Sequence, residues 1–297
     1  MKKFIYIAVA VILATSLMPG INYSAPAHLT EVTIESPGAS PEMLLQAEGV
    51  IAKRLNAYGI TAFETERHPE KAQIRILFQE AAPLEAVIPL LTDVGRLEFS
   101  AVYTQAEVFS MINQGGQKEA WKNWLPLEQQ AKEEQAVIGH ITPERIPDFG
   151  RFTASREAAQ GLPDGLRFAL SLTPDENGRL ELYALQYGQD GKPALTGAAV
   201  ERSQAHTDET AETASIRLAF NEEGSARWAQ ATRDNLGRPI AIAFDGQIVF
   251  APRVLAEIQS GQSQITGQFS FEQARLMAAL IQGGELPAPF AVKAVKQ

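Results

Sequence analysis

Hydrophobic and polar residues along residues 28–103 alternate with the periods of strands and helices in turn. Val32 and Ile34 share one face of a predicted strand, and a helix is predicted between an N-cap at Ser40 and a glycine stop at Gly59. Further strands are predicted over 60–67, 73–79 and 96–103, and a second helix from Pro83. This order of strand, helix, strand, strand, helix and strand predicts a ferredoxin-like base over residues 28–103.

The rest of the chain divides into a polar stretch and a second globular part. Residues 104–160 are rich in Gln, Glu and Lys and predict a connector of helices followed by an irregular segment. Residues 161–286 mix predicted strands with helices that begin at Asn221 and Ser270, and we interpret them as a head. Residues 287–297 predict a last strand that returns to the base. The predicted class is α+β, with a ferredoxin-like base and a mixed α/β head.

The N-terminus carries information about the compartment. Lys2 and Lys3 precede an apolar run over residues 4–18, and Ala25-Pro26-Ala27 has the form of a cleavage site. Residues 1–27 therefore predict either a cleaved signal peptide or an N-terminal membrane anchor. Either interpretation places the remaining chain outside the cytoplasm, in the periplasm, with membrane contact confined to this segment.

Charge and composition exclude several classes of function. The formal net charge is −9 at pH 7, and nucleic-acid binding needs clustered Lys and Arg, so we expect no nucleic-acid partner. The chain has no cysteine, which removes disulfides, thiol catalysis and zinc–cysteine sites. The histidines lie far apart without metal-ligand spacing, and no cofactor motif or nucleophile motif is present. We therefore predict a protein that is not an enzyme, with no metal and no cofactor.

Two apolar segments of the predicted head retain functional interest. Phe250 and Pro252 end one strand, and the proline leaves an edge that cannot donate a hydrogen bond. Ile265 and Phe269 lie on a neighbouring strand with a glycine between them. These four residues predict a groove that accepts an extended polypeptide. The alternative is that both segments are ordinary core strands.

Several segments in their order and spacing resemble one family, the SecD/SecDF protein-export factors, in their first periplasmic domain (P1, with a base and a head). In the head these are residues 182–185, 221–226, 235–242, 244–246, 251–252, 265–269 and 283–289, and in the base residues 51–56 and 96–99. The resemblance is weak over 104–160. It implies a base that stands on the membrane and a head that swings on it while binding emerging polypeptide.

The resemblance also implies a hinge and marks two departures. The hinge residues would be Gly161 and Pro163 on one chain crossing, and Gly283, Gly284 and Pro287 on the other. The glycine-rich motif that the family places after its first membrane helix is not found near the N-terminus. The membrane helices that carry the proton path in the family are not found either, so we expect no motor role for this chain.

The leading hypothesis is a non-catalytic, extracytoplasmic, SecD-P1-like protein that binds exported or unfolded polypeptide, or Sec translocon components, and assists protein translocation. An alternative is a structural adaptor that docks a fixed envelope or translocase partner. A third, less favoured, is an extracytoplasmic hydrolase built on paired carboxylates. A deep, mobile apolar groove favours the first hypothesis, and a flat, fixed patch favours the adaptor.

Overall fold

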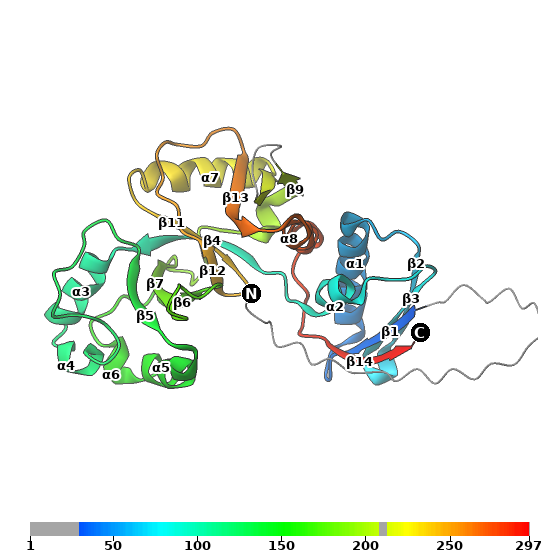
Figure 1. The fold of residues 1–297 in the computed structure, drawn as a ribbon, viewed down its shortest axis with the longest axis horizontal. Coiled ribbons are helices and arrows are strands. Elements are labelled where there is room, and N and C mark those ends of the chain that lie inside the picture. Colours follow the sequence, from blue (N-terminus) through cyan, green and yellow to red (C-terminus); the bar gives the residue numbers. More distant parts are fainter. Residues whose placement is uncertain (1–29, 208–212, 297) are drawn as a thin grey trace, which may run out of the picture.

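The computed structural model describes residues 30–207 and 213–296 of the chain. The leader expected over residues 1–27 lies outside these ranges. Within them, no helix is both long and apolar enough to cross a membrane. Figure 1 shows an elongated molecule, with a small base at one end and a larger head at the other. The predicted α+β class is confirmed, since separate sheets and helices build both parts.

The base is a sheet with helices on one face. Its elements are β1 (Thr30–Glu35), α1 (Pro41–Tyr58), β2 (Phe63–His68), the 3₁₀ helix η1 (Pro69–Lys71), β3 (Gln73–Phe78), α2 (Leu84–Thr92) and β14 (Ala291–Lys296). The four strands pair antiparallel in the order β14-β1-β3-β2. Val32 and Ile74 are buried under the helices, while Glu31 and Arg75 approach each other on the open face. This alternation gives the sheet one apolar and one charged face.

The segment predicted to close the base sheet does not do so. β4 (Leu97–Tyr103) leaves the base and pairs in the head. Both of its faces are buried, because Phe99 packs against Trp228 on one side while Val102 joins a separate core on the other. A strand in the base sheet would expose one of these faces to water. The strand beside β1 is instead β14, so the whole head is inserted between α2 and the last strand of the base.

The larger sheet of the head closes on itself as a barrel of five strands. These are β7 (Leu180–Gln186), β6 (Leu166–Ser171), β12 (Gln247–Phe250), β11 (Ile240–Phe244) and β4, which pairs back onto β7. β5 (Val137–Ile141) extends the sheet beside β7, and β8 (Leu195–Thr196) beside β4. Small and branched side chains such as Val102, Ala169 and Ala243 fill its interior. Such side chains suit a narrow barrel.

A three-stranded sheet lies next to the barrel. It contains β9 (Val200–Thr207), β10 (Ala214–Phe220) and β13 (Gln262–Phe269), in the antiparallel order β13-β10-β9. α7 (Glu222–Asp234) follows β10 and α8 (Phe271–Gly283) follows β13, while the short 3₁₀ helix η3 (Gly197–Ala199) precedes β9. Side-chain caps fix both helix starts, from Asn221 and from Ser270. α8 lies between α1 of the base and β9 of the head (Figure 1).

Residues 104–160 form a lobe of the head, where we expected a connector with an irregular end. The lobe contains α3 (Gln105–Gln114), α4 (Lys118–Trp121), η2 (Pro143–Arg145), α5 (Ile146–Thr153) and α6 (Arg156–Ala159), and it also supplies β5. Its aromatic core includes Trp121 and Phe149, which pack against Phe168 of β6. This packing fixes the lobe to the outer face of the barrel.

Candidate functional site in the head

A cavity of about 580 Å³ opens on the head between α7, β11 and the segment that links β12 to β13. Its apolar lining consists of Leu218, Trp228, Ile240, Ile242, Phe250, Pro252, Val254, Leu255, Ala256 and Ile258. Its polar lining consists of Arg217, Thr232, Arg253, Gln262, Ser263 and Gln264. Neither a histidine nor a carboxylate is among these described lining residues. A mostly apolar recess with few polar groups is the usual form of a ligand site.

Two of the four predicted groove residues line this cavity. Phe250, at the end of β12, is 39% exposed, and Pro252 follows it on the segment that forms one wall. The carbonyl of Pro252 accepts a 3.0 Å hydrogen bond from the Ile240 amide, so β11 fixes this wall. Proline has no amide hydrogen to return this bond to the Ile240 carbonyl, so the pairing of the wall with β11 is one-sided at Pro252.

The other two predicted residues do not line the cavity. Ile265 is fully buried and lies opposite Ile216 of β10, so it belongs to the core of the sheet. The ring of Phe269 folds back over Gly267, where an added Cβ would lie 2.5 Å from a ring carbon. Phe269 packs against the main core from the far end of β13. For these two residues the core-strand alternative is correct.

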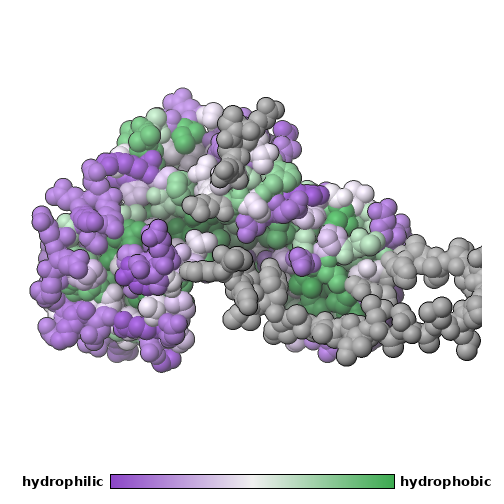
Figure 2. All heavy atoms as spheres, in the orientation of Figure 1, coloured by the Kyte–Doolittle hydropathy of each residue, from purple (hydrophilic) through white to green (hydrophobic). Residues whose placement is uncertain are grey.

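Two exposed apolar residues that sequence reasoning missed lie on the cavity wall or next to it. Leu255 is 88% exposed on the wall, and Leu236, at the end of α7, is 52% exposed. An isolated bridge joins Leu236 to Val254, the neighbour of Leu255. Figure 2 shows hydrophobic residues exposed at this upper end of the head, whereas hydrophilic residues dominate the surface over α3–α6. The signal in the sequence was the short apolar run Val254-Leu255-Ala256, which follows Arg253.

Trp228 forms part of the cavity and also belongs to the core. It is 4% exposed, and its ring lies 5.2 Å from that of Phe99 and 5.7 Å from that of Phe220. Its buried indole N–H has no hydrogen-bond partner. Trp228 is therefore a core residue, and the cavity lies directly against this aromatic cluster.

The cavity wall is held in place along its length. The amide of Val254 donates to the carbonyl of Arg238, and the amide of Gly237 donates to the carbonyl of Val254, both at 2.9 Å. Further along, the amide of Ile258 donates a 3.0 Å hydrogen bond to the hydroxyl of the fully buried Thr232. Leu255 is therefore exposed on a wall whose flanking residues are fixed, and ordering it costs little when a ligand binds.

Two ion pairs on the protein surface connect the same wall to the lobe and to α7. Arg253 pairs with Glu134 of the lobe, and Arg233 of α7 pairs with Glu257. Hydrogen bonds from these guanidinium groups hold the pKa values of the two carboxyl groups below their usual range. Both pairs are exposed to water, so each adds little stability but helps to set the position of the wall.

The predicted hinge lies only in part at the junction between base and head. Gly161 and Pro163 are inside the head, where Gly161 packs against Gly115 and Pro163 precedes β6. That half of the prediction is wrong, because the chain crosses from base to head between α2 and β4. The crossing residues there are 93–96, and they include Gly95 with a φ of 77°.

The second crossing contains the other predicted residues. Gly283 ends α8 against Arg54, since an added Cβ would lie 2.2 Å from the Arg54 Cγ atom. Gly284 follows with a φ of 87°, and Pro287 lies on the path to β14. Two glycines are thus required here, one for close packing and one for backbone conformation.

A buried arginine joins the two crossings. Arg54 of α1 is fully buried, and its guanidinium donates hydrogen bonds to the carbonyls of Leu90, Asp93, Val94 and Gly284. Burial lowers the pKa of Arg54 to about 10, while nearby carboxylates act in the opposite direction, so the group is charged at neutral pH.

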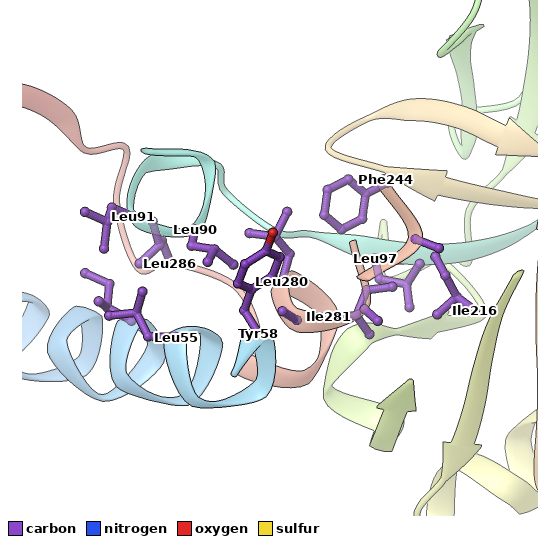
Figure 3. Packing of buried hydrophobic residues seen from close by; sticks show 14 of the residues in the cluster. Leu55, Tyr58, Leu90, Leu91, Leu97, Ile216, Phe244, Leu280, Ile281 and Leu286 are labelled. Carbon is purple, nitrogen blue, oxygen red and sulfur yellow. The ribbon is translucent and has the colours of Figure 1, made fainter. Parts of the chain in front are cut away.

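Apolar packing continues through the same junction. Figure 3 shows Leu280 and Ile281 of α8 between Tyr58 and Leu90 of the base and Leu97 of the head. These residues belong to a single buried cluster that extends from the base sheet to the head sheet. The junction is therefore packed as a core and is not an open linker.

The described ranges contain no group of three or more His, Asp or Glu side chains placed to hold a metal ion.

Comparisons with known proteins identify the head. Residues 174–288 match the family model described as SecDF, P1 head subdomain. The protein translocase subunit SecD of Acidaminococcus fermentans is 38% identical over 103 residues, which cover 35% of this chain and 24% of that protein. SecD of Rhodothermus marinus is 31% identical over 156 residues, or 52% of this chain and 25% of that protein. The chain thus spans about a quarter of the length of these relatives.

Solved structures share the fold. A crystal structure of SecDF in a super-membrane-facing form matches 90% of this chain and 30% of that chain, with a TM-score of 0.56 and 21% identity. A structure of SecDF described as a membrane component that enhances protein export matches 90% of this chain and 99% of that chain, with a TM-score of 0.54 and 21% identity. Residues 174–288 are thus similar to the SecDF P1 head subdomain, and the chain shares its fold with the solved SecDF structures.

Proposed function

We propose that the protein binds exported or unfolded polypeptide in the head cavity and thereby assists protein translocation. The observation that carries this proposal is Leu255, which is 88% exposed on the wall of an apolar cavity. Covering such a leucine stabilises a complex by about 1.5–3 kcal/mol. An unfolded chain exposes apolar side chains that can cover Leu255 and enter the cavity.

The relatives support a role in export. The matched relatives are protein translocase subunits, and the matched SecDF structure is described as enhancing protein export. For this chain we propose exported polypeptides or Sec translocon components as partners. Its place would be outside the cytoplasm, with membrane contact only through residues 1–27. The cavity lining includes no acid–base pair, which favours a binding role without catalysis.

An adaptor that docks one fixed partner is the second candidate. Such a protein would present a flat apolar patch, whereas the exposed apolar residues here surround a hollow of about 580 Å³. The hollow favours a ligand whose side chains enter it. A hydrolase with paired carboxylates receives no support at this cavity, because no carboxylate is among the residues that line it.

Site-specific photo-crosslinking in exporting cells tests the proposal. Probes replace Leu255 and Phe250 at the cavity, and a control probe replaces Glu176, which is exposed at the distant turn between β6 and β7. Crosslinks to many exported chains, increasing when export is stalled, are the expected result. One discrete product would favour the adaptor, and no product beyond the Glu176 control would overturn polypeptide binding.

A further inference from the structure

Among the described strands, β13 forms an unpaired edge of the three-stranded sheet, and this edge borders the cavity. Three consecutive residues of β13 line the cavity, Gln262, Ser263 and Gln264. Successive side chains of a strand point to opposite faces of its sheet. Adjacent residues of the central strand β10, Arg217 and Leu218, line the same cavity, so the cavity reaches both faces of this sheet and passes around its β13 edge. The cavity thus runs beside the main chain of β13.

The hydrogen-bond pattern tells which main-chain groups face that edge. The Phe220 amide donates a 2.8 Å hydrogen bond to the Gly261 carbonyl at the start of the β10–β13 pair. Bonded and non-bonded residue pairs alternate along antiparallel strands. Ser263, two residues after Gly261 and opposite Leu218, therefore directs its main-chain groups toward β10. The main-chain groups of Gln264 point away from β10, toward the open edge.

The sequence of this edge distinguishes it from the others in the described part of the chain. The edge strands of six or more residues are β2, β9, β13 and β14. β2, β9 and β14 each carry charged residues, and the side chain of Gln282 also covers β9 by bonding the Ser203 amide. β13 carries neither a charged residue nor a proline. Charge and proline are the usual protection against strand addition, and β13 lacks both.

We propose that the bound polypeptide adds to β13 as a further strand, with its main chain bonded to Gln264 and one of its apolar side chains in the cavity. This inference rests on the proposed function and specifies how the ligand is held. Main-chain bonding tolerates varied sequences, while the cavity selects an apolar residue. One binding site can therefore accept many different exported chains.

The charges at the cavity specify the ligand further. The charged residues of the lining are Arg217 and Arg253, and Arg253 already pairs with Glu134. Arg217 contacts the His206 ring and lies one residue pair away from Ser263, opposite Gln264. A positive charge beside the open edge complements an acidic residue on the added strand. The ligand is thus an extended, alternating apolar segment that carries an acidic residue.

The test uses the unaltered protein and a nine-residue synthetic peptide of alternating valine and threonine with an aspartate at each end. Residue-resolved amide hydrogen exchange follows Gln264, with Ser263 as the internal control because its amide already faces β10. We expect the peptide to slow exchange at Gln264 about tenfold or more, with little change at Ser263. Two further peptides carry N-methyl groups on alternate residues, one on the amides that would face β13 and the other on the amides that would face away from it. The first should bind much more weakly than the second, because only the first loses the amides that bond to β13.

Fluorescence of the three tryptophans, compared between the unaltered protein and Trp228→Phe, separates two kinds of failure. If the peptide changes the Trp228 signal while exchange at Gln264 is unaltered, strand addition is wrong and polypeptide binding in the cavity stands. Equal binding of both N-methylated peptides would overturn strand addition as well. If neither the Trp228 signal nor the exchange at Gln264 responds, strand addition and polypeptide binding in the cavity both fail.

Discussion

The guanidinium of Arg54, in the first helix of the base, donates a 2.7 Å hydrogen bond to the carbonyl of Gly284, at the end of α8. The same side chain reaches the carbonyls of Asp93 and Val94, each at 2.7 Å, on the other chain crossing. One buried cation thus holds both segments that connect base and head. Charge-assisted hydrogen bonds are about twice as strong as neutral ones, so this contact fixes the junction.

Removing this cation should destabilise the whole protein. Arg54→Met leaves several buried carbonyls without a donor, and each hydrogen bond to a charged group contributes about 1.5–3 kcal/mol. We expect the free energy of unfolding to fall by about 3 kcal/mol or more. Urea denaturation measures this change, with the exposed neighbour Lys53→Met as the matched control. A loss no larger than that of Lys53→Met would show that Arg54 is not essential to the junction.

Glycine at the first crossing should be irreplaceable. Gly95 has a φ of 77°, and an added Cβ would lie 2.2 Å from the Arg54 Nη2 atom. Gly95→Ala should therefore cost about 1–3 kcal/mol through backbone strain and displacement of Arg54. Gly49→Ala, in open space on α1, should instead stabilise the protein by about 0.5–1 kcal/mol. Thermal unfolding compares the two variants, and similar stabilities would contradict the account of this crossing.

The stability of the lobe should depend on pH through Glu107. Burial alone would raise the pKa of Glu107, but hydrogen bonds from Arg238 and from the Thr104 amide and hydroxyl lower it overall. A lowered pKa means that ionised Glu107 stabilises the fold at neutral pH, and this contribution disappears as pH falls through the folded-state pKa.

Glu107→Gln, which keeps a capping side chain, measures the Glu107 contribution. The pair with Arg238 is partly exposed, so screening limits the loss at pH 7 to about 0.5–1 kcal/mol. The difference from the unaltered protein should be smaller at about pH 3 than at pH 7, because the contribution is complete only above 4.5, the pKa of an unperturbed glutamate, and is lost as pH falls toward the lowered folded-state pKa. Urea unfolding at both pH values provides the comparison. A difference that persists unchanged at the lower pH would exclude the charge of Glu107 as its cause.

Base and head should unfold together, because the core is continuous through α8. Leu280 is 2% exposed, and Leu280→Ala should cost about 2–5 kcal/mol through lost burial and a cavity. Native-state hydrogen exchange should show this loss equally in β3 of the base and β10 of the head. Leu125→Ala, a substitution of the equally buried lobe residue, is the control for a site away from the junction. A loss of hydrogen-exchange protection confined to the base or to the head would indicate that the two parts unfold separately.

Local elements could be predicted from the sequence because their signals are local. The Ser40 and Ser270 caps both form as expected, and Asp245 takes the positive φ that its hairpin turn requires. The destination of β4 could not be predicted, because a strand buried on both faces resembles any other short apolar run. Its partner β11 lies more than a hundred residues later in the chain. Pairing between strands so far apart in the chain produces no signal in the local sequence.

The candidate site was predicted only in part, because only some of its residues have a signal in the local sequence. Phe250 and Pro252, which line the cavity, could be predicted because an aromatic residue and a proline at the end of a strand are visible in the sequence itself. Leu255 lies in a segment that looked like an ordinary loop, and only the fold shows that Thr232 and Arg238 fix the wall on both sides of it. The buried role of Arg54 was also hidden, since an arginine on a predicted helix is usually exposed.

The most direct test of polypeptide binding at the head compares two exposed leucines. Leu255→Asp changes the cavity wall, and Leu45→Asp changes a leucine that is 54% exposed on α1 of the base. Binding of a chemically unfolded, fluorescently labelled protein is measured by anisotropy for both variants and the unaltered protein. Leu255→Asp should raise Kd about tenfold or more, since burial of a leucine contributes about 1.5–3 kcal/mol, while Leu45→Asp leaves Kd unchanged. Equal affinities for all three proteins would contradict polypeptide binding at this cavity.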